Sequence, residues 1–149
     1  MKSGGLGMSE QQNVRTLVEA YSCFKRGDIE GVLNVLTDDV EWITPGLPEL
    51  MPVAGKRRGR KEVAQFFFTL DKQENVELFE PQEYIAQGDK VIALIKYRGR
   101  VRATGKTVES DLVHLFTFSN GLVKRFQEYY DTALTLHAYA TVSSRTSAA

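Results

Sequence analysis

The chain of 149 residues has the length of one ordinary domain, and its composition, 42% hydrophobic and 26% charged, is that of a globular protein. Lysine plus arginine and aspartate plus glutamate both number 19, so net charge gives no reason to expect a nucleic acid or a membrane surface as partner. The single cysteine, Cys23, excludes an internal disulfide framework and a cysteine-rich zinc site, and it favours a reducing, cytoplasmic location. We therefore expect one core, with a small molecule or a second copy of the chain as partner.

The two ends of the chain differ in composition from the part between them. Residues 1–8 contain no apolar run long enough for a secretory signal and are predicted to be a flexible leader. Residues 141–149 are small and polar, which predicts a flexible tail. Residues 9–140 then form a single domain. No stretch of the chain approaches the roughly 18 consecutive apolar residues of a membrane-spanning helix.

The first part of this domain is predicted to be helical. Apolar residues recur every three or four positions over residues 10–26, which is typical of an amphipathic helix, and Gly27 ends it. Asp28 is a good N-cap for a second, short helix that ends at residues 37–39. A short strand is expected next, at residues 40–44.

A loop and a third helix follow this strand. Residues 45–59 contain three prolines and three glycines among apolar side chains, and an apolar loop is expected to cover another part of the protein. Residues 60–71 carry apolar side chains on one face, which predicts the third helix. The basic run at residues 56–61 is interpreted as a solvated loop and helix start rather than a nucleotide site, because no glycine-rich phosphate-binding spacing is present.

Four strands are predicted in the rest of the domain, the first of them at residues 76–86. A two-residue turn at Thr104 and Gly105 between the second and third strands would align Arg100 with Glu109, and Arg98 with Asp111. The opposite face of these strands then forms the core, with Ala93, Ile95, Tyr97, Leu112, His114, Phe116 and Phe118.

The last hairpin, around residues 119–121, decides which side chains of the final strand face inward. A three-residue Ser-Asn-Gly loop would align His114 with Phe126 and turn Glu128 toward the core, whereas a two-residue Asn-Gly turn would bring Arg125 inward. We favour the three-residue loop, because phenylalanine belongs in a core and arginine does not.

Three stretches of the sequence, AYSCFKRGDIEGVLNVLTDDVEW, PVAGKRRGRKEVAQFF and HLFTFSNGLVKRFQEYYDT, resemble the nuclear transport factor 2-like (NTF2-like) superfamily. Over residues 8–139 the chain is similar to its SnoaL-like and ketosteroid-isomerase-like branch. The resemblance implies an α+β fold, a cone in which a curved, mostly antiparallel sheet wraps around N-terminal helices and encloses a pocket. It implies no single activity, because this fold hosts isomerases, cyclases, dehydratases, epoxide hydrolases and non-catalytic proteins.

The resemblance also indicates where a site would lie. The position that matches the proton-shuttling aspartate of steroid isomerases best is Thr44, which cannot be a general base at neutral pH. Tyr21 resembles, to within one residue, the tyrosine that donates to the oxyanion in those enzymes, and His114 corresponds to their second donor, a protonated aspartate. Glu128 resembles one carboxylate of the related epoxide hydrolases, whose Arg-x-Asp element has no match here.

The residues themselves point to the same pair. Diagonal neighbours on adjacent strands lie about 7 Å apart, so His114 and Glu128 can meet, and a histidine beside a carboxylate can donate or abstract a proton near pH 7. The predicted catalytic residues are His114, Glu128 and Tyr21. The predicted pocket-lining residues are Trp42, Thr44, Leu47, Met51, Phe67, Ile95, Tyr97, Leu112, Phe116, Phe126 and Tyr130. No metal ion or cofactor is expected.

Three functions remain open. The chain is an isomerase, cyclase or dehydratase acting on a small apolar carbonyl or hydroxylated compound, a module that binds a small hydrophobic ligand unchanged, or a structural homodimer with a filled cavity. On the third reading His114 and Glu128 are only a satisfied buried pair. Apolar residues on the outer sheet face, Ile92, Leu94, Val113 and Leu115, predict a homodimer through that face.

Overall fold

The computed structural model describes residues 7–141, so the predicted leader and tail lie almost entirely outside the described residues. The elements, in chain order, are α1 (Met8–Lys25), α2 (Ile29–Leu33), β1 (Leu36–Thr44), β2 (Gly55–Arg58), α3 (Gly59–Gln73), β3 (Glu74–Gln87), β4 (Lys90–Val101), β5 (Thr107–Ser119), β6 (Leu122–Tyr129) and α4 (Thr132–Tyr139). Within residues 7–141, no helix is long and apolar enough to cross a membrane.

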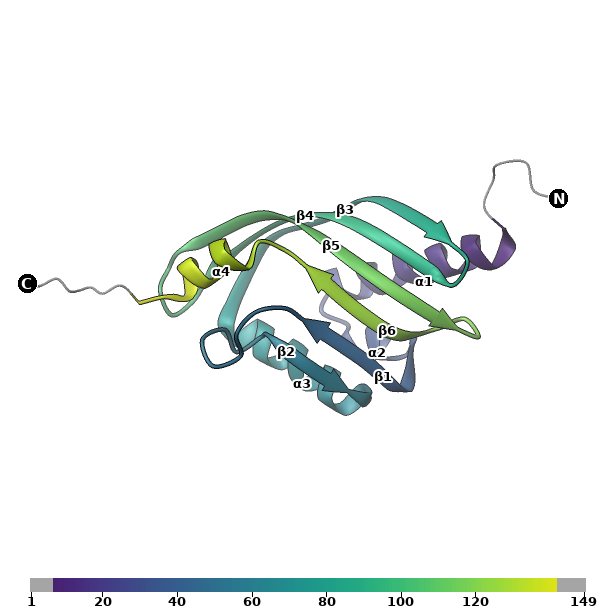
Figure 1. The fold of residues 1–149 in the computed structure, drawn as a ribbon, viewed down its shortest axis with the longest axis horizontal. Helices are drawn as coiled ribbons and strands as arrows, with labels where there is room; N and C mark the ends of the chain where they lie inside the picture. Colours follow the sequence, from purple (N-terminus) through teal and green to yellow (C-terminus); the bar gives the residue numbers. More distant parts are fainter. Residues whose placement is uncertain (1–6, 142–149) are drawn as a thin grey trace, which may run out of the picture.

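The strands form one six-stranded sheet in the order β2-β1-β6-β5-β4-β3. All neighbouring strands are antiparallel except β1 and β6, which are parallel. The sheet is curved, and α1 and α3 lie against its inner side (Figure 1). The predicted α+β architecture, a curved and mostly antiparallel sheet around N-terminal helices, is confirmed.

The two N-terminal helices form where local sequence signals predict them. Gly27, at a φ of 80°, adopts the left-handed conformation that ends α1. The Asp28 carboxylate then caps α2 by accepting a hydrogen bond from the Gly31 backbone amide at 3.0 Å. The second helix is shorter than predicted, because Leu36 already pairs with Val123 and begins β1.

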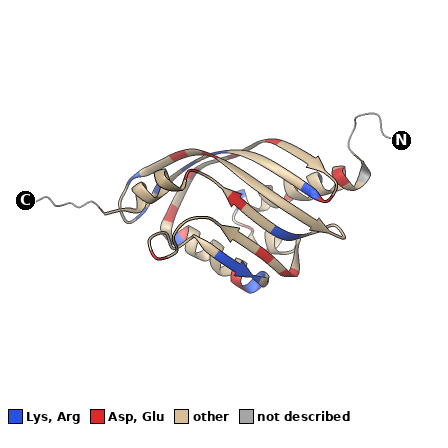
Figure 2. Ribbon diagram, in the orientation of Figure 1, with Lys and Arg blue, Asp and Glu red and all other residues tan. Residues whose placement is uncertain are grey.

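The helix start predicted in the basic run is confirmed, because Arg60 and Lys61 lie in the first turn of α3, but the predicted loop is wrong. The first part of the run forms β2, the basic edge strand of the sheet, which pairs with β1 (Figure 2). Arg57 donates to the Val53 carbonyl at 2.9 Å, and the Arg60 guanidinium donates to the Leu36 carbonyl at 2.6 Å. These arginines therefore hold the 45–54 loop and the start of β1 in place.

The predicted pairing of β4 with β5 is wrong by two residues. Arg98, not Arg100, aligns with Glu109, and Lys96 aligns with Asp111. The cause is a connection longer than the predicted two-residue turn. Because side chains alternate with a period of two, this shift leaves the same residues on the core face.

The turn between β5 and β6 also differs from the prediction. Asn120 at a φ of 51° and Gly121 at 83° form a two-residue turn, with Ser119 aligned to Leu122. The predicted three-residue loop is therefore wrong, and the alternative two-residue Asn-Gly turn is present. Its two left-handed residues match the twist of a hairpin.

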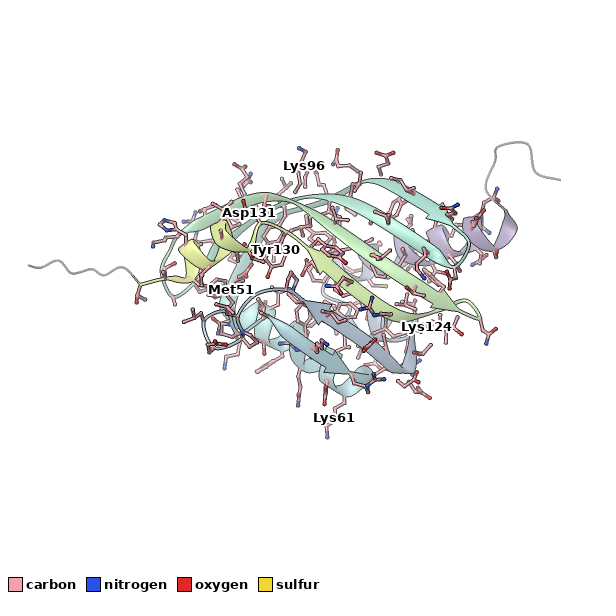
Figure 3. The ribbon with its side chains drawn as sticks, in the orientation of Figure 1. Met51, Lys61, Lys96, Lys124, Tyr130 and Asp131 are labelled. Atoms are coloured by element: carbon pink, nitrogen blue, oxygen red, sulfur yellow. The ribbon has the colours of Figure 1, made fainter. Side chains whose placement is uncertain are left out.

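The inward orientation of the final strand nevertheless holds, because a β-bulge follows the turn. The register shifts between the Thr117–Arg125 and Phe118–Val123 pairs, which leaves Lys124 as the extra residue of β6. Lys124 is exposed at the outer surface (Figure 3). The bulge thus returns the buried Phe126 to the core, and it aligns Glu128 directly with His114.

Candidate functional site

Three polar side chains from three elements meet inside the sheet. Tyr21 of α1 lies 2.7 Å from His114, measured from Oη to Nδ1. His114 of β5 lies 2.8 Å from Glu128 of β6, measured from Nε2 to Oε2. The direct pairing of the last two residues across the hairpin sets this contact. We refer to the three as the Tyr21–His114–Glu128 relay.

The hydrogen bonds of the relay determine where its protons lie. A carboxylate only accepts, so Nε2 of His114 donates to Glu128, and Nδ1 of the neutral ring is left to accept from the Tyr21 hydroxyl. Burial raises the pKa of Tyr21 well above its usual value, and Tyr84 and Glu128 act in the same direction. Tyr21 therefore keeps its proton.

The two ends of the relay differ in what they can offer a ligand. Both ring nitrogens of His114 are engaged within the relay. Oε1 of Glu128 accepts no hydrogen bond from the residues that the structure describes. A proton from a bound molecule is therefore more readily taken by Glu128 than by the imidazole.

Aromatic rings surround the relay. The imidazole of His114 lies edge-on to Phe126 at 4.8 Å between ring centroids, and it also contacts Phe79 and Phe116. Trp42 stacks on the other side of this cluster, 4.0 Å from the Phe126 ring. Surroundings of this low polarity strengthen the electrostatic interactions of the relay.

Two small cavities lie beside the relay. The first, which we call the relay cavity, measures about 80 Å³ and is lined by Tyr21, His114 and Trp42, among others. The second, which we call the Glu74 cavity, measures about 70 Å³ and is lined by Glu74 and Thr44, among others. Both cavities share one set of lining residues: Phe24, Phe66, Leu70, Phe79 and Glu128. Glu128 thus borders both spaces.

Most of the predicted pocket-lining residues border one of these cavities. Trp42, Phe67, Phe116 and Phe126 line the relay cavity, and Thr44, Tyr97, Leu112 and Tyr130 line the Glu74 cavity. The Tyr130 hydroxyl donates to the Pro45 carbonyl at 2.9 Å and so ties the end of β6 to the 45–54 loop (Figure 3).

Three predicted lining residues do not border either cavity. Leu47 lies in a turn in which its carbonyl accepts hydrogen bonds from the amides of Leu50 and Met51, and the residue is 48% exposed. Met51, from the same turn, is buried instead, and so is Ile95 of β4, but both pack in the core away from the cavities.

Sequence reasoning missed a second polar cluster. Glu74, at the start of β3, accepts hydrogen bonds from the hydroxyls of Tyr97 and Tyr139. Burial, and next the Glu74 carboxylate, raise the pKa of both tyrosines, so both remain donors. Tyr139 belongs to α4, a helix that was not predicted, although Asp131 is an N-cap signal for it and accepts from the Leu134 amide at 2.9 Å.

Among residues 7–141, no group of three or more histidine, cysteine, aspartate or glutamate side chains could hold a metal ion.

Comparison with known proteins places this geometry in a family. Residues 14–126 match the family model of the SnoaL-like domain. A solved NTF2-like protein from Burkholderia xenovorans LB400 is 34% identical, with a TM-score of 0.81, over 90% of this chain and 100% of that one. An NTF2-like protein of unknown function from Burkholderia pseudomallei K96243 is 27% identical, with a TM-score of 0.78, over 87% and 98%.

A third similar structure comes from a protein crystallised together with a small molecule. TerC, co-crystallised with polyporic acid, is 26% identical, with a TM-score of 0.74, over 86% of this chain and 98% of that one. None of the proteins with curated functions matches the chain.

Proposed function

The chain belongs to the SnoaL-like branch of the NTF2-like superfamily, and from this premise we propose that it is an acid–base catalyst. Its substrate is a small apolar compound with a carbonyl or hydroxyl group, and the reaction is an isomerisation, a cyclisation or a dehydration. The observation that carries this proposal is the hydrogen-bonded Tyr21–His114–Glu128 relay inside an aromatic cluster. TerC, which was crystallised with polyporic acid, supports the small-molecule class of ligand.

Glu128 acts as the general base of the proposed reaction. It removes a proton from the carbon next to a carbonyl, the electrons of the C–H bond form a carbon–carbon double bond, and the carbonyl oxygen becomes an enolate. The proton that Glu128 has taken completes one of three reactions. Its return to another carbon of a conjugated enolate gives isomerisation. Its transfer to the oxygen of a second carbonyl that the enolate carbon attacks gives cyclisation, and its transfer to a neighbouring hydroxyl, which leaves as water while the carbonyl re-forms, gives dehydration.

His114 and Tyr21 position the base in this scheme. The Nε2 proton of His114 holds one oxygen of Glu128, which leaves the other oxygen directed to the reacting proton. The Tyr21 hydroxyl donates to Nδ1 and so helps to hold the imidazole in the orientation in which Nε2 donates to Glu128. The proposed reaction thus has one catalytic residue, Glu128, and two positioning residues.

The indole of Trp42 is suited to stabilise the enolate oxygen. Its Nε1 is buried and has no hydrogen-bond partner among the described residues, and the side chain lines the relay cavity. A buried donor without a partner costs about 1–3 kcal/mol, so an oxygen acceptor on the ligand would offset that cost. Such a donor becomes more useful as negative charge develops on the oxygen.

The exchange of carbon-bound hydrogen for deuterium tests this proposal without knowledge of the natural substrate. We expect the protein to accelerate exchange at the carbon next to the carbonyl of 1-indanone, as followed by proton NMR in heavy water. Glu128→Gln should reduce this acceleration by about 100-fold, the loss typical of a general base. Glu77→Gln, an exposed carboxylate of β3 that pairs with Arg98 and Arg100, is the matched control and should retain it. Equal rates with and without the protein, or full activity of Glu128→Gln, would contradict the proposal.

The small size of the cavities favours one alternative, a structural homodimer with a filled cavity, because ligand pockets usually measure about 300–1,000 Å³ and the two cavities measure about 70 and 80 Å³. Thr44, which takes the place of the base in related isomerases, favours another, a non-catalytic module that binds a small hydrophobic ligand. Binding of 1-indanone with no exchange of its hydrogens would favour this alternative.

A further inference from the structure

We infer that the Glu74 cavity is a second polar subsite, which binds a hydroxyl group of the ligand between Glu74 and Thr44. The inference rests on the proposed function for the other end of the ligand, the carbonyl group beside the relay. It narrows the substrate class to small cyclic ketones that carry a hydroxyl group at the far end of the ring.

Glu74 supplies the hydrogen-bond acceptor of this subsite. Only 8% of the residue is exposed, and each carboxylate oxygen accepts one tyrosine hydroxyl, from Tyr97 and from Tyr139. Within residues 7–141, no lysine, arginine or histidine forms an ion pair with it. A carboxylate has about four acceptor positions, so two remain for further donors. A buried carboxylate without a cation is stabilised by each additional hydrogen bond.

Thr44 supplies the donor. The residue is 3% exposed, it lines the same cavity as Glu74, and its hydroxyl has no hydrogen-bond partner among the described residues. Leaving such a hydroxyl unpaired in the interior is unfavourable, because it has lost its hydrogen bonds to water. A ligand hydroxyl both donates and accepts, so it satisfies the carboxylate and the threonine at once. A carbonyl or an ether oxygen could not donate to Glu74.

The position of Glu128 connects this subsite to the relay. Glu128 borders both cavities, together with Phe24, Phe66, Leu70 and Phe79. A ring that lies among these apolar side chains would place its carbonyl toward Trp42 and its hydroxyl toward Glu74. Each cavity, at about 70 and 80 Å³, is about half the size of the 150 Å³ cavity that holds benzene. We therefore expect a ligand of one or two small rings that bridges the relay cavity and the Glu74 cavity.

A pair of probes that differ by one hydroxyl group tests the inference. Calorimetry should show that the protein binds 5-hydroxy-1-indanone about 10-fold more tightly than 1-indanone, because a hydrogen bond to a charged group contributes about 1.5–3 kcal/mol. Glu74→Gln and Thr44→Val should each reduce this preference to about twofold or less, and each should leave the affinity for 1-indanone within about twofold. The exposed Glu77→Gln variant is the control and should keep the full preference.

Several results would overturn the inference: no preference in the unmodified protein, no binding of either probe, or equal weakening of both probes by the two variants. Thermal unfolding identifies a variant that has lost its fold. Valine has nearly the same shape as threonine and adds no polar group, so Thr44→Val tests the subsite even if Glu74→Gln fails to fold. Because the readout is binding, a retained preference without hydrogen exchange would refute only the catalytic proposal. Exchange that depends on Glu128, without a preference for the hydroxyl, would refute only the subsite.

Discussion

At the scale of single residues, the state of the His114 ring decides how the relay works. The ring accepts a hydrogen bond from the Tyr21 hydroxyl at Nδ1 and donates one to Glu128 from Nε2. If the tyrosine hydroxyl is removed, Nδ1 loses its partner in a buried environment, and only the bond to Glu128 still orients the ring. Tyr21 is then a positioning residue whose loss weakens catalysis without abolishing it.

We therefore expect Tyr21→Phe to slow hydrogen exchange in 1-indanone by about 10-fold, well short of the loss expected for Glu128→Gln. Nitrogen NMR should show Nδ1 unprotonated and Nε2 protonated in both proteins, because Glu128 still accepts from Nε2. The Nδ1 signal should shift in the variant, because it loses the hydrogen bond from Tyr21. His137, the other histidine of the chain, serves as the internal reference. An unchanged Nδ1 signal in Tyr21→Phe would show that the hydroxyl does not donate to His114.

The residues of the relay could be predicted from the sequence, whereas Glu74 could not. Strand alternation and family resemblance both indicate His114 and Glu128, because their positions follow from local pattern. The environment of Glu74 depends on Tyr139, which lies 65 positions further along the chain. No local pattern reports a contact of that separation, and an isolated glutamate next to a predicted helix is usually a solvated residue.

At the scale of elements, the prediction for the hairpin of β5 and β6 has the wrong turn type but the correct inward orientation of the β6 side chains. The Asn-Gly turn alone would direct Arg125 inward, but the bulge at Lys124 reverses the alternation. The sequence contains no clear signal for this bulge, because Lys124 is an ordinary solvent-facing residue. The orientation of Phe126 was predictable for a different reason, namely that only one alternation buries apolar side chains.

The bulge leads to a prediction about two deletions. Removal of Lys124 should leave a regular strand with the same aligned pairs, because Lys124 is the residue without a partner. Removal of Gln127 should instead turn Glu128 outward and bring Tyr129 opposite His114, because a shift of one residue reverses every side chain beyond it.

Thermal unfolding and the exchange assay check this pair. The Lys124 deletion should unfold within about 3 °C of the unmodified protein, a change of about 1 kcal/mol or less, and it should retain exchange activity. The Gln127 deletion should lose exchange activity. The assignment of the bulge would be wrong if the Lys124 deletion were the more damaging of the two.

At the scale of the whole molecule, the buried tyrosines make stability depend on alkaline pH. Five of the six tyrosines have a raised pKa, and burial is the largest cause in each: Tyr21, Tyr84, Tyr97, Tyr130 and Tyr139. In the unfolded chain these side chains ionise near pH 10. Their contribution to stability is therefore complete below about pH 10, and it is lost as the pH rises toward the raised values of the folded state.

Above about pH 10, each of the more deeply buried tyrosines, Tyr21, Tyr97 and Tyr130, should lower the free energy of unfolding by as much as about 1.4 kcal/mol per pH unit. The more exposed Tyr84 and Tyr139 should contribute less, because water screens their charge. Urea unfolding at about pH 8 and about pH 11 measures the loss, and tyrosinate absorbance measures ionisation directly. We expect most of the absorbance change to coincide with unfolding. Ionisation of all the tyrosines near pH 10 with the fold intact would contradict the burial that the structure shows.

The outer face of the sheet is the surface through which the sequence predicts a homodimer. We propose that a second copy of the chain packs on this face, which lies opposite α1 and α3 and from which Lys96 projects (Figure 3). Its apolar residues are Ile85, Ile92, Leu94, Val113, Leu115 and Tyr129. Ile85 is 47% exposed and Tyr129 is 50% exposed, so the patch has two large apolar side chains at its margins.

Charge complementarity favours a second copy over an unrelated partner. Acidic and basic residues on this face are paired with each other, as in Lys96–Asp111 and Arg98–Glu109, so two copies can meet without net repulsion. Leu115→Glu should convert the dimer to a monomer in light scattering after gel filtration, because it places a charge in the contact. Val18→Glu, at a 48% exposed apolar position of α1, is the matched control and should remain dimeric. A monomeric unmodified protein would refute the proposal, and the half-exposed tyrosine and isoleucine would then be ordinary surface residues.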